Sequence, residues 1–330
     1  MAALPNTKLT TTSVGNRETL ANMVDRTDRE ETPIYSMVSK GKAESVHPEW
    51  LTEEIEAPQA NRKTEGDEYT FDAVESPKRL GNYTQIMGKT FIISETQETV
   101  SEAGNTQKTK HQKLIKGIEL KGDVEYSILA PQASIAGNNR QSGGLPTWYE
   151  SNVSRGAGGA NGGYDINTGL TVAPTNGTQR AFTKAQLDDV MKQGWDNGAK
   201  FKSVVLSSYL KSVFVTFMSD PAVAPFRYAV KDGKGNSIIS NADFYEGPYG
   251  KVLVIPNRVQ SANASLARNV HLLDPEKLSW EWLRSIKEDK EVAKTGDAKK
   301  TVLIGEGCLK VKNEKGLGVV ADVFGLNETT

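Results

Sequence analysis

The forty residues from Val46 to Gln85 constrain the fold of this chain most strongly, because they are strand-like yet too polar to bury a core of their own. Nine of them are acidic and four are basic, and Pro, Asn and Gly gather at 58–66, where the chain must reverse. Two such strands, at roughly 3.3 Å per residue, would extend about 60 Å. An isolated two-stranded ribbon is only marginally stable in water. The stretch therefore predicts an arm that rests on another subunit.

The composition bounds what the rest of the chain can be. Its 330 residues, 37% hydrophobic and 25% charged, can fill one large domain or two. The net charge of −1 provides no global basic field for nucleic acid, so any DNA contact must be local. The first twenty residues lack the pattern of a signal peptide, and no segment approaches eighteen apolar residues. We expect a soluble protein, made in a cytoplasm, with no membrane contact.

The chain has one cysteine, Cys308. A single thiol excludes an intramolecular disulfide, a thiolate zinc cluster and a redox pair. Its neighbours Leu303, Ile304 and Leu309 are apolar. The sequence therefore predicts a buried, unreactive thiol.

Hydrophobic spacing predicts a long helix from Thr106 to about Ala130, in which Leu120, Val124 and Ile128 recur every four residues. Ten glycines between positions 137 and 177 predict a mobile loop or lid at the main internal boundary. Helices and strands then alternate as in an α/β layer. The expected elements are helices at 183–194, with Thr183 as N-cap, and at 208–218, and strands at 201–206, 251–255, 301–304, 308–311 and 317–323.

Motifs that carry chemistry are weak in this sequence. The segment Gly88-Lys89-Thr90 has Tyr83 where a phosphate loop needs glycine. The glycine-rich run at 156–163 has no strand before it and no helix directly after it, as a dinucleotide site requires. The sequence His47-Pro48-Glu49 matches half of a zinc-deaminase signature, and one cysteine cannot supply the other half. We expect no catalytic residue, no cofactor and no metal site, and hence no enzyme.

Charge is distributed unevenly between two segments. Residues 46–85 carry a net charge of −5, whereas five lysines against Glu119 give the first half of the long helix +4. Complementary surfaces of this kind favour register and partner choice. One hypothesis is that the acidic ribbon of one subunit lies across the basic helix of its neighbour. The alternative is that both surfaces are simply solvated, since exposed pairs contribute about 0 to 1 kcal/mol.

Three strings, in this order and spacing, resemble the major capsid proteins of tailed phages with the Hong Kong 97-type fold. They are RLGNYTQI at 79–86, GGLPTW at 143–148 and AKTGDAKKTVLIGEGCLKVKNEKGLGV at 293–319. The resemblance implies an α+β fold with an arm, an extended two-stranded loop, a spine helix with a peripheral sheet, and an axial α/β domain. The implied divisions are 1–33 (N-terminal arm), 34–90 (extended loop), 91–149 (spine helix and first part of the peripheral domain), 150–285 (axial domain) and 286–330 (return strands).

The function implied by the resemblance is structural. Such a chain forms hexamers and pentamers that tile an icosahedral shell around double-stranded DNA, assembled in the host cytoplasm and retained in the virion. Its partners would be copies of itself, a portal, scaffolding or decoration proteins, and the packaged DNA on the inner face. The alternative is a tail-associated or secreted β-rich binding protein, expected as a monomer or trimer that binds a glycan.

Candidate contact residues follow from the charge pattern and the resemblance. The expected contacts between subunits are Trp50, Glu53, Glu54, Lys63, Asp67, Lys110, Lys113 and Lys116. The arm offers Arg17, Arg26 and Arg29 as candidates for DNA contact, although acidic neighbours counter them. The prototype of the family joins subunits through a lysine–asparagine bond. Here Lys40, Lys42 or Lys63 would supply the amine, but no motif matches the prototype's trio.

Overall fold

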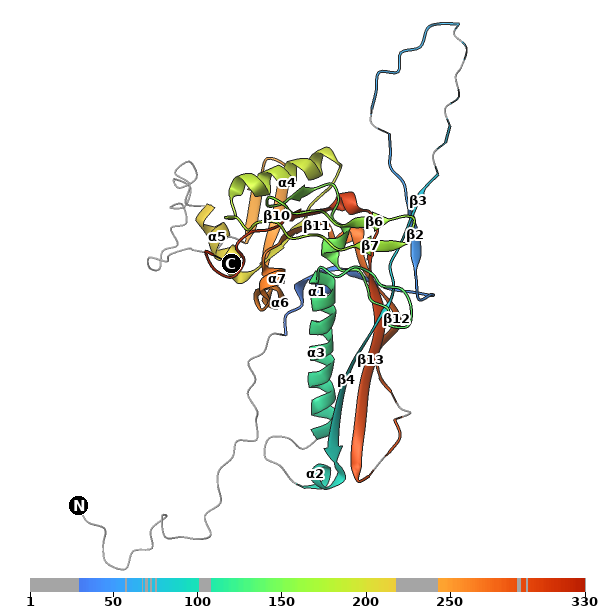
Figure 1. Ribbon diagram of the computed structural model, residues 1–330, viewed down its shortest axis with the longest axis vertical. Coiled ribbons are helices and arrows are strands. Elements are labelled where there is room, and N and C mark those ends of the chain that lie inside the picture. Colours follow the sequence, from blue (N-terminus) through green and yellow to red (C-terminus); the bar gives the residue numbers. More distant parts are fainter. Residues whose placement is uncertain are drawn as a thin grey trace, which may run out of the picture.

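The computed structural model describes residues 30–329, except 57, 67, 69–70, 72, 75, 101–107, 218–242, 290–291 and 295. The molecule is elongated, with a long helix and long strands at one end, a compact α/β body beside them and an extended loop that projects away (Figure 1). The arginines proposed for DNA contact, Arg17, Arg26 and Arg29, lie outside the described residues, as does Asp67.

The spine helix, α3 (Lys108–Leu129), has nearly the predicted bounds. Its predicted apolar positions Leu120, Val124 and Ile128 are fully buried. They belong to one core cluster with Met87 and Leu303 of a four-stranded sheet. The sheet has the order β1 (Ser39–Lys42), β12 (Leu278–Asp289), β13 (Ala298–Val311) and β4 (Gln85–Ser94), with β1 parallel to β12 and the other pairs antiparallel.

The strands predicted at 301–304 and 308–311 are one continuous strand, β13. The glycines between them suggest a break, but they are sites of close packing. A Cβ at Gly305 would lie 3.1 Å from the ring of Trp282, and one at Gly307 would lie 2.7 Å from Nε1 of Trp280. The glycines therefore let two tryptophans cross the strand without interrupting its hydrogen bonds.

A six-stranded sheet forms the axial body. Two helices, α4 (Lys184–Asp196) and α5 (Ser208–Phe217), share one core cluster with strands of this sheet. Thr183 caps α4 as predicted, in a capping box with Gln186. The strand order is β5 (Val153–Ser154), β14 (Leu317–Val320), β11 (Val270–Leu273), β8 (Ser203–Leu206), β10 (Gly250–Pro256) and β9 (Phe244–Gly247).

The last strand, β14, corrects one expectation. Residues 317–320 pair with β5 and β11 in the axial sheet and do not complete the peripheral one. All four residues of β14 are buried, which suits an interior strand covered on both faces. The return segment thus supplies strands to both sheets, and the boundary expected at 285/286 falls inside β12.

The glycine-rich run at 156–163, where a mobile loop or lid was expected, packs against the body at Gly156. The Gly156 amide donates a 3.1 Å hydrogen bond to Oδ2 of the buried Asp322. A Cβ at Gly156 would lie 2.0 Å from the Thr178 carbonyl oxygen. Arg268 in turn pairs with Asp322 at 2.6 Å. Here the glycines allow close approach between backbone segments.

Strand pairing in the extended loop is confined to its base. β2 (Glu49–Thr52) pairs antiparallel with β3 (Lys78–Gly81), and the described residues between 53 and 77 form no further strand. A long ribbon was expected here. The remaining short elements are α1 (Pro33–Met37), α2 (Glu95–Thr99), η2 (Leu145–Trp148), β6 (Gly163–Asp165), β7 (Leu170–Val172), α6 (Arg258–Ser261), α7 (Ala264–Ala267), η4 (Pro275–Lys277) and η5 (Glu314–Gly316).

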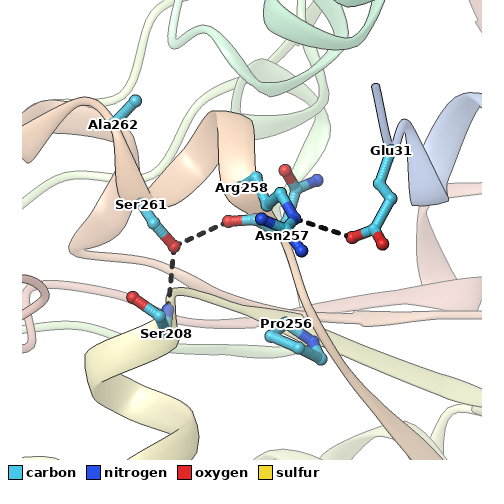
Figure 2. A pocket seen from close by; sticks show the side chains of 7 residues that line it. All are labelled: Glu31, Ser208, Pro256, Asn257, Arg258, Ser261 and Ala262. Atoms are coloured by element: carbon cyan, nitrogen blue, oxygen red, sulfur yellow. Dashed lines mark hydrogen bonds and ion pairs between the residues drawn. The ribbon is translucent and has the colours of Figure 1, made fainter. Parts of the chain in front are cut away.

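The segment at 30–38, called the arm root below, enters the molecule beside the axial body. Ile34 of α1 is fully buried in the same core cluster as the spine helix. Glu31 pairs with Arg258 at 2.9 Å beside an open pocket of about 480 Å³, lined also by Asn257, Ser208 and Ser261 (Figure 2). The arm root thus lies next to both α3 and α6.

Candidate assembly surfaces

The base of the extended loop is fixed to its own subunit by Trp50. The indole Nε1 donates a 2.8 Å hydrogen bond to the carbonyl of Val311 at the end of β13. The Trp50 ring lies 5.8 Å from the ring of the buried Trp148, which stacks on Tyr164. These contacts involve one chain, so the structure gives Trp50, a predicted contact between subunits, a role within its own subunit.

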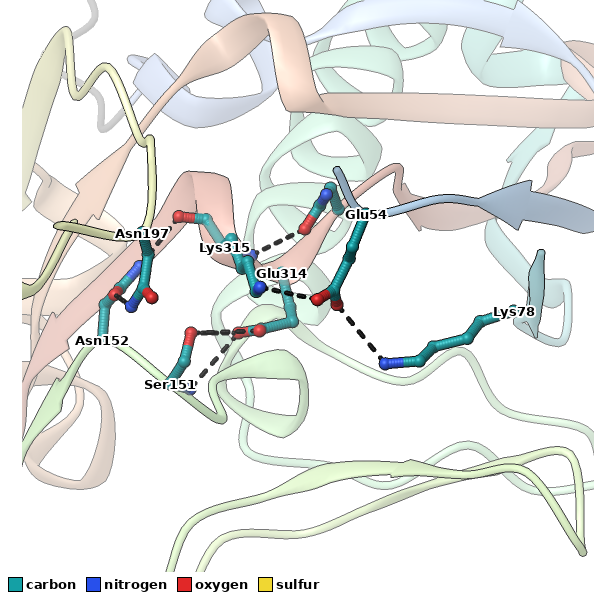
Figure 3. Close-up of polar contacts among 8 residues, drawn as sticks. Glu54, Lys78, Ser151, Asn152, Asn197, Glu314 and Lys315 are labelled. Atoms are coloured by element: carbon teal, nitrogen blue, oxygen red, sulfur yellow. Dashed lines mark hydrogen bonds and ion pairs between the residues drawn. The ribbon is translucent and has the colours of Figure 1, made fainter. Parts of the chain in front are cut away.

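Glu54 lies where the chain leaves β2, and it also has partners in its own chain. Its carboxylate contacts Nζ of Lys78 at 3.3 Å and Nζ of Lys315 at 2.8 Å (Figure 3). The hydrogen bond from Lys315 is the main cause that lowers the pKa of Glu54. Close by, Glu314 accepts hydrogen bonds from Ser151. These polar contacts hold the loop base against the turn between β13 and β14.

Beyond this base, the loop presents apolar side chains to solvent. We use "loop tip" for residues 53–77. Ile55, Val74 and Phe71 are 100%, 96% and 94% exposed. The predicted contacts Glu53 and Lys63 are exposed in the same segment. Single exposed apolar residues are common, but these three large ones lie in one extended, acidic segment and form apolar surface that the described part of the chain does not cover.

The basic start of the spine helix is less available than its sequence suggests. Lys113 pairs with Glu288 of β12 at 2.7 Å, and Lys116 pairs with Glu119 at 2.9 Å. The side chain of Lys108 is buried and donates to backbone carbonyls. Exposed positions on this helix include Lys110, Lys121 and Leu114. Among the predicted contact lysines of this helix, Lys110 is therefore the one whose side chain is exposed.

Buried charged groups form joints that sequence reasoning missed. Glu306 of β13 is 2% exposed and accepts hydrogen bonds from Thr84, Arg140 and Arg284. Burial acts to raise the pKa of Glu306, but these hydrogen bonds outweigh it and leave the pKa lowered. Glu125 of α3 is fully buried. Its place on the apolar stripe of the helix, one position after Val124, was the available sequence signal.

Three residues from the motifs considered for catalysis or ligand binding are buried or paired within the fold. Lys89 lies in β4 and pairs with Asp123 at 2.7 Å, so Gly88-Lys89-Thr90 is part of a strand. His271 is buried, with Nδ1 at 2.8 Å from the Tyr149 hydroxyl. Cys308 is buried as predicted, and burial raises its pKa to about 12. Within the described ranges, no group of three His, Cys, Asp or Glu side chains is placed to hold a metal ion.

No helix in the described part of the chain is both long enough and apolar enough to cross a membrane. Polar side chains that line the open pocket beside Arg258 already have partners. Glu31 pairs with Arg258, and the Ser261 hydroxyl donates to the Asn257 carbonyl and accepts from the Ser208 amide.

Comparison with solved structures shows the fold. The chain resembles the capsid asymmetric unit of cyanophage A-1(L), with a TM-score of 0.64 and 12% identity, over 96% of this chain and 98% of the other. It also resembles the capsid of a native GTA particle, with a TM-score of 0.58 and 12% identity over 95% and 97%. A chain of Gordonia phage Cozz gives a TM-score of 0.58 and 12% identity over 98% of both. The α+β phage-capsid fold expected from the sequence is confirmed.

Comparison of sequences shows the family. A major capsid protein of Escherichia phage Phieco32 is 27% identical over 120 residues, which span 36% of this chain and about a third of that relative (34%). The family model described as "SU10 major capsid protein" matches residues 6–324. This match covers nearly the whole chain, and it favours the capsid interpretation over a tail-associated or secreted binding protein. The chain therefore belongs to the SU10 major capsid protein family.

Proposed function

We propose that this chain is the structural subunit of an icosahedral phage head, in which hexamers and pentamers close a shell around double-stranded DNA. The loop tip carries the argument, because Ile55, Phe71 and Val74 of a major-capsid family member are almost wholly exposed. About 25 cal/mol per Å² of apolar area favours their burial against a second copy. Each such contact between two subunits is weak, but a shell contains many copies of it, so the contacts together stabilise the assembly.

In this proposal the loop tip of one subunit extends to the neighbouring subunit. Trp50, and Glu54 where the loop leaves β2, keep the loop base on its own subunit. The neighbour would offer the exposed helix positions Lys110 and Lys121 to the acidic residues Glu53, Glu56 and Glu65. Lys113 and Lys116 remain proposed contacts, but each already pairs with a carboxylate of its own chain and would have to bind a second one from the neighbour. Lys63 and Asp67 belong to the same reaching segment.

The proposal places the protein in the virion after assembly in the host cytoplasm, with a portal, scaffolding or decoration proteins as further partners. The net charge of −1 supports it, since such a shell would not trap its DNA electrostatically.

Negative-stain electron microscopy of the purified full-length chain tests this function. Closed shells or isolated rings of five and six copies are expected. A monodisperse monomer or trimer that binds an immobilised glycan would support the binding-protein alternative and reject the proposal.

A further inference from the structure

Glu125 is a buried carboxylate at a point where three parts of the chain meet. Its Oε1 accepts hydrogen bonds from the Ile34 amide at 3.0 Å and from Nδ2 of Asn257 at 2.6 Å. Its Oε2 accepts from the Tyr35 amide at 2.7 Å. The donors belong to α1 in the arm root and to the segment between β10 and α6 in the axial body. Glu125 itself belongs to the spine helix.

The acceptor role of Glu125 is one that an apolar residue at this position could not fill. The neighbouring buried positions of the helix are Leu120, Val124 and Ile128, and a leucine here would continue the same apolar stripe. A leucine would, however, leave the Ile34 and Tyr35 amides and the Asn257 side-chain amide without this acceptor, at a cost of about 1 to 3 kcal/mol for each buried donor left unpaired. Burial raises the pKa of Glu125, although the hydrogen bonds and the charge of Lys40 act against this.

We propose that Glu125 is a joint that couples the position of the arm root to the position of the axial body on the spine helix. The coupling follows from the shared acceptor, because Ile34 and Asn257 donate to the same oxygen atom. A displacement of Asn257 moves or weakens the acceptor of the arm root. A displacement of the arm root acts on Asn257 in the same way.

The surroundings of the joint leave room for such movement. Another contact between the two parts is the ion pair of Glu31 and Arg258, whose side chains are 66% and 56% exposed. Exposed pairs contribute about 0 to 1 kcal/mol, so the buried joint is the stronger of the two. The open pocket of about 480 Å³ separates the arm root from Ser208 and Ser261 (Figure 2).

The consequence of this joint in a shell rests on the proposed function. One chain must then fit both hexamers and pentamers, in which neighbouring axial bodies meet at different angles. A joint of this kind makes the arm root respond when the axial body tilts. The joint itself is a property of the single chain, so it can be tested without any shell.

The sharpest variant is Asn257→Asp. Asn257 also caps α6, because its Oδ1 accepts from the amides of Val259 and Gln260. An aspartate retains this cap but replaces the donor that faces Glu125 with a second acceptor. In unassembled full-length protein, hydrogen exchange at the Ile34 and Tyr35 amides should become about tenfold faster or more. The Ile34 and Tyr35 amides donate to Glu125 and not to residue 257, so faster exchange at these amides in this variant would be transmitted through Glu125.

The reciprocal variant is Glu125→Gln, with Glu119→Gln as the control on the same helix. Glutamine retains one acceptor and places an NH₂ group against the remaining donors. Exchange should rise at Ile34 and Tyr35, and also at Val259 and Gln260. Glu119→Gln changes a half-exposed carboxylate that pairs with Lys116, and it should match the wild type at these four amides. If Glu125→Gln does not fold, Asn257→Asp decides alone. Unchanged exchange at Ile34 and Tyr35 in Asn257→Asp overturns the joint, whether or not the chain forms shells.

Discussion

The indole Nε1 of Trp50 donates a hydrogen bond to the carbonyl oxygen of Val311, 261 residues further along the chain. This bond joins the base of the extended loop to the end of the longest strand in the peripheral sheet. The loop base is therefore fixed to its own subunit, whereas Ile55, Phe71 and Val74 of the loop tip are exposed. The same loop can therefore be anchored in one subunit and reach toward another.

We expect Trp50→Phe to destabilise the protein by about 1 kcal/mol or more, because the Val311 carbonyl loses its donor and the smaller phenyl ring fills less of the space beside Trp148. Urea unfolding of the full-length chain measures the change. Trp195→Phe is the matched control, because Trp195 is 60% exposed. Equal midpoints for both variants would show that the Trp50 bond contributes nothing to the loop base.

Two glycine substitutions should have opposite signs. At Gly307 a Cβ would lie 2.7 Å from Trp280 Nε1 and 2.8 Å from the Glu281 carbonyl oxygen, so Gly307→Ala should cost more than about 2 kcal/mol. At Gly117, inside α3, a Cβ meets nothing within 4 Å, and Gly117→Ala should stabilise the chain by about 1 kcal/mol. Thermal unfolding compares the two, and a tolerated Gly307→Ala would contradict the close packing across β13.

Stability should fall on acidification because of His271. Burial is the main cause that lowers its pKa from 6.5 to about 3, so the folded chain excludes a proton that the unfolded chain takes up. The contribution is fully present above pH 6.5 and is lost as the pH falls toward 3, at up to about 1.4 kcal/mol per pH unit. Denaturant unfolding between these values should show a shallower loss in His271→Asn than in the wild type. Parallel curves would mean that His271 does not remain neutral in the fold.

Charge reversal on the spine helix should weaken assembly and leave folding intact. Lys110→Glu with Lys121→Glu replaces two exposed cations by anions, so we expect fewer shells, with the loss reduced at high salt as screening grows. Lys184→Glu with Lys192→Glu, at exposed positions of α4, provides the same charge change elsewhere. Particle yield from sedimentation checks the result. An equal loss in both double variants would point to net charge, and an unchanged yield in the first would remove the helix from the interface.

Local patterns in the sequence predicted the parts of the fold that depend on local periodicity. The spacing of Leu120, Val124 and Ile128 marks α3 because one face of a helix recurs every three to four residues. Thr183 and Gln186 mark the start of α4 by the same kind of local chemistry. In both cases the determining contacts lie within one or two helical turns.

The remainder depended on contacts between distant residues. By composition, the glycines at 156–163 indicate a flexible loop and those in β13 indicate a break in the strand. In the structure the first group packs at Asp322 and the second at the tryptophans of β12, which are remote in sequence from the glycines. Glu125 meets Ile34 across 91 positions. The sequence does not show that Lys113 has a partner, whereas in the fold it forms an ion pair with Glu288. Only the tertiary structure reveals which charges are already paired.

The position of the loop tip in an assembled particle is the most direct test of the proposed contact between subunits. Cryo-electron microscopy of shells formed by the full-length chain would locate residues 53–77 relative to the neighbouring subunit. We predict that Ile55, Phe71 and Val74 are buried against that neighbour, beside Lys110 and Lys121 of its spine helix. Loop tips that remain in solvent, or that fold back onto their own subunit, would contradict the account.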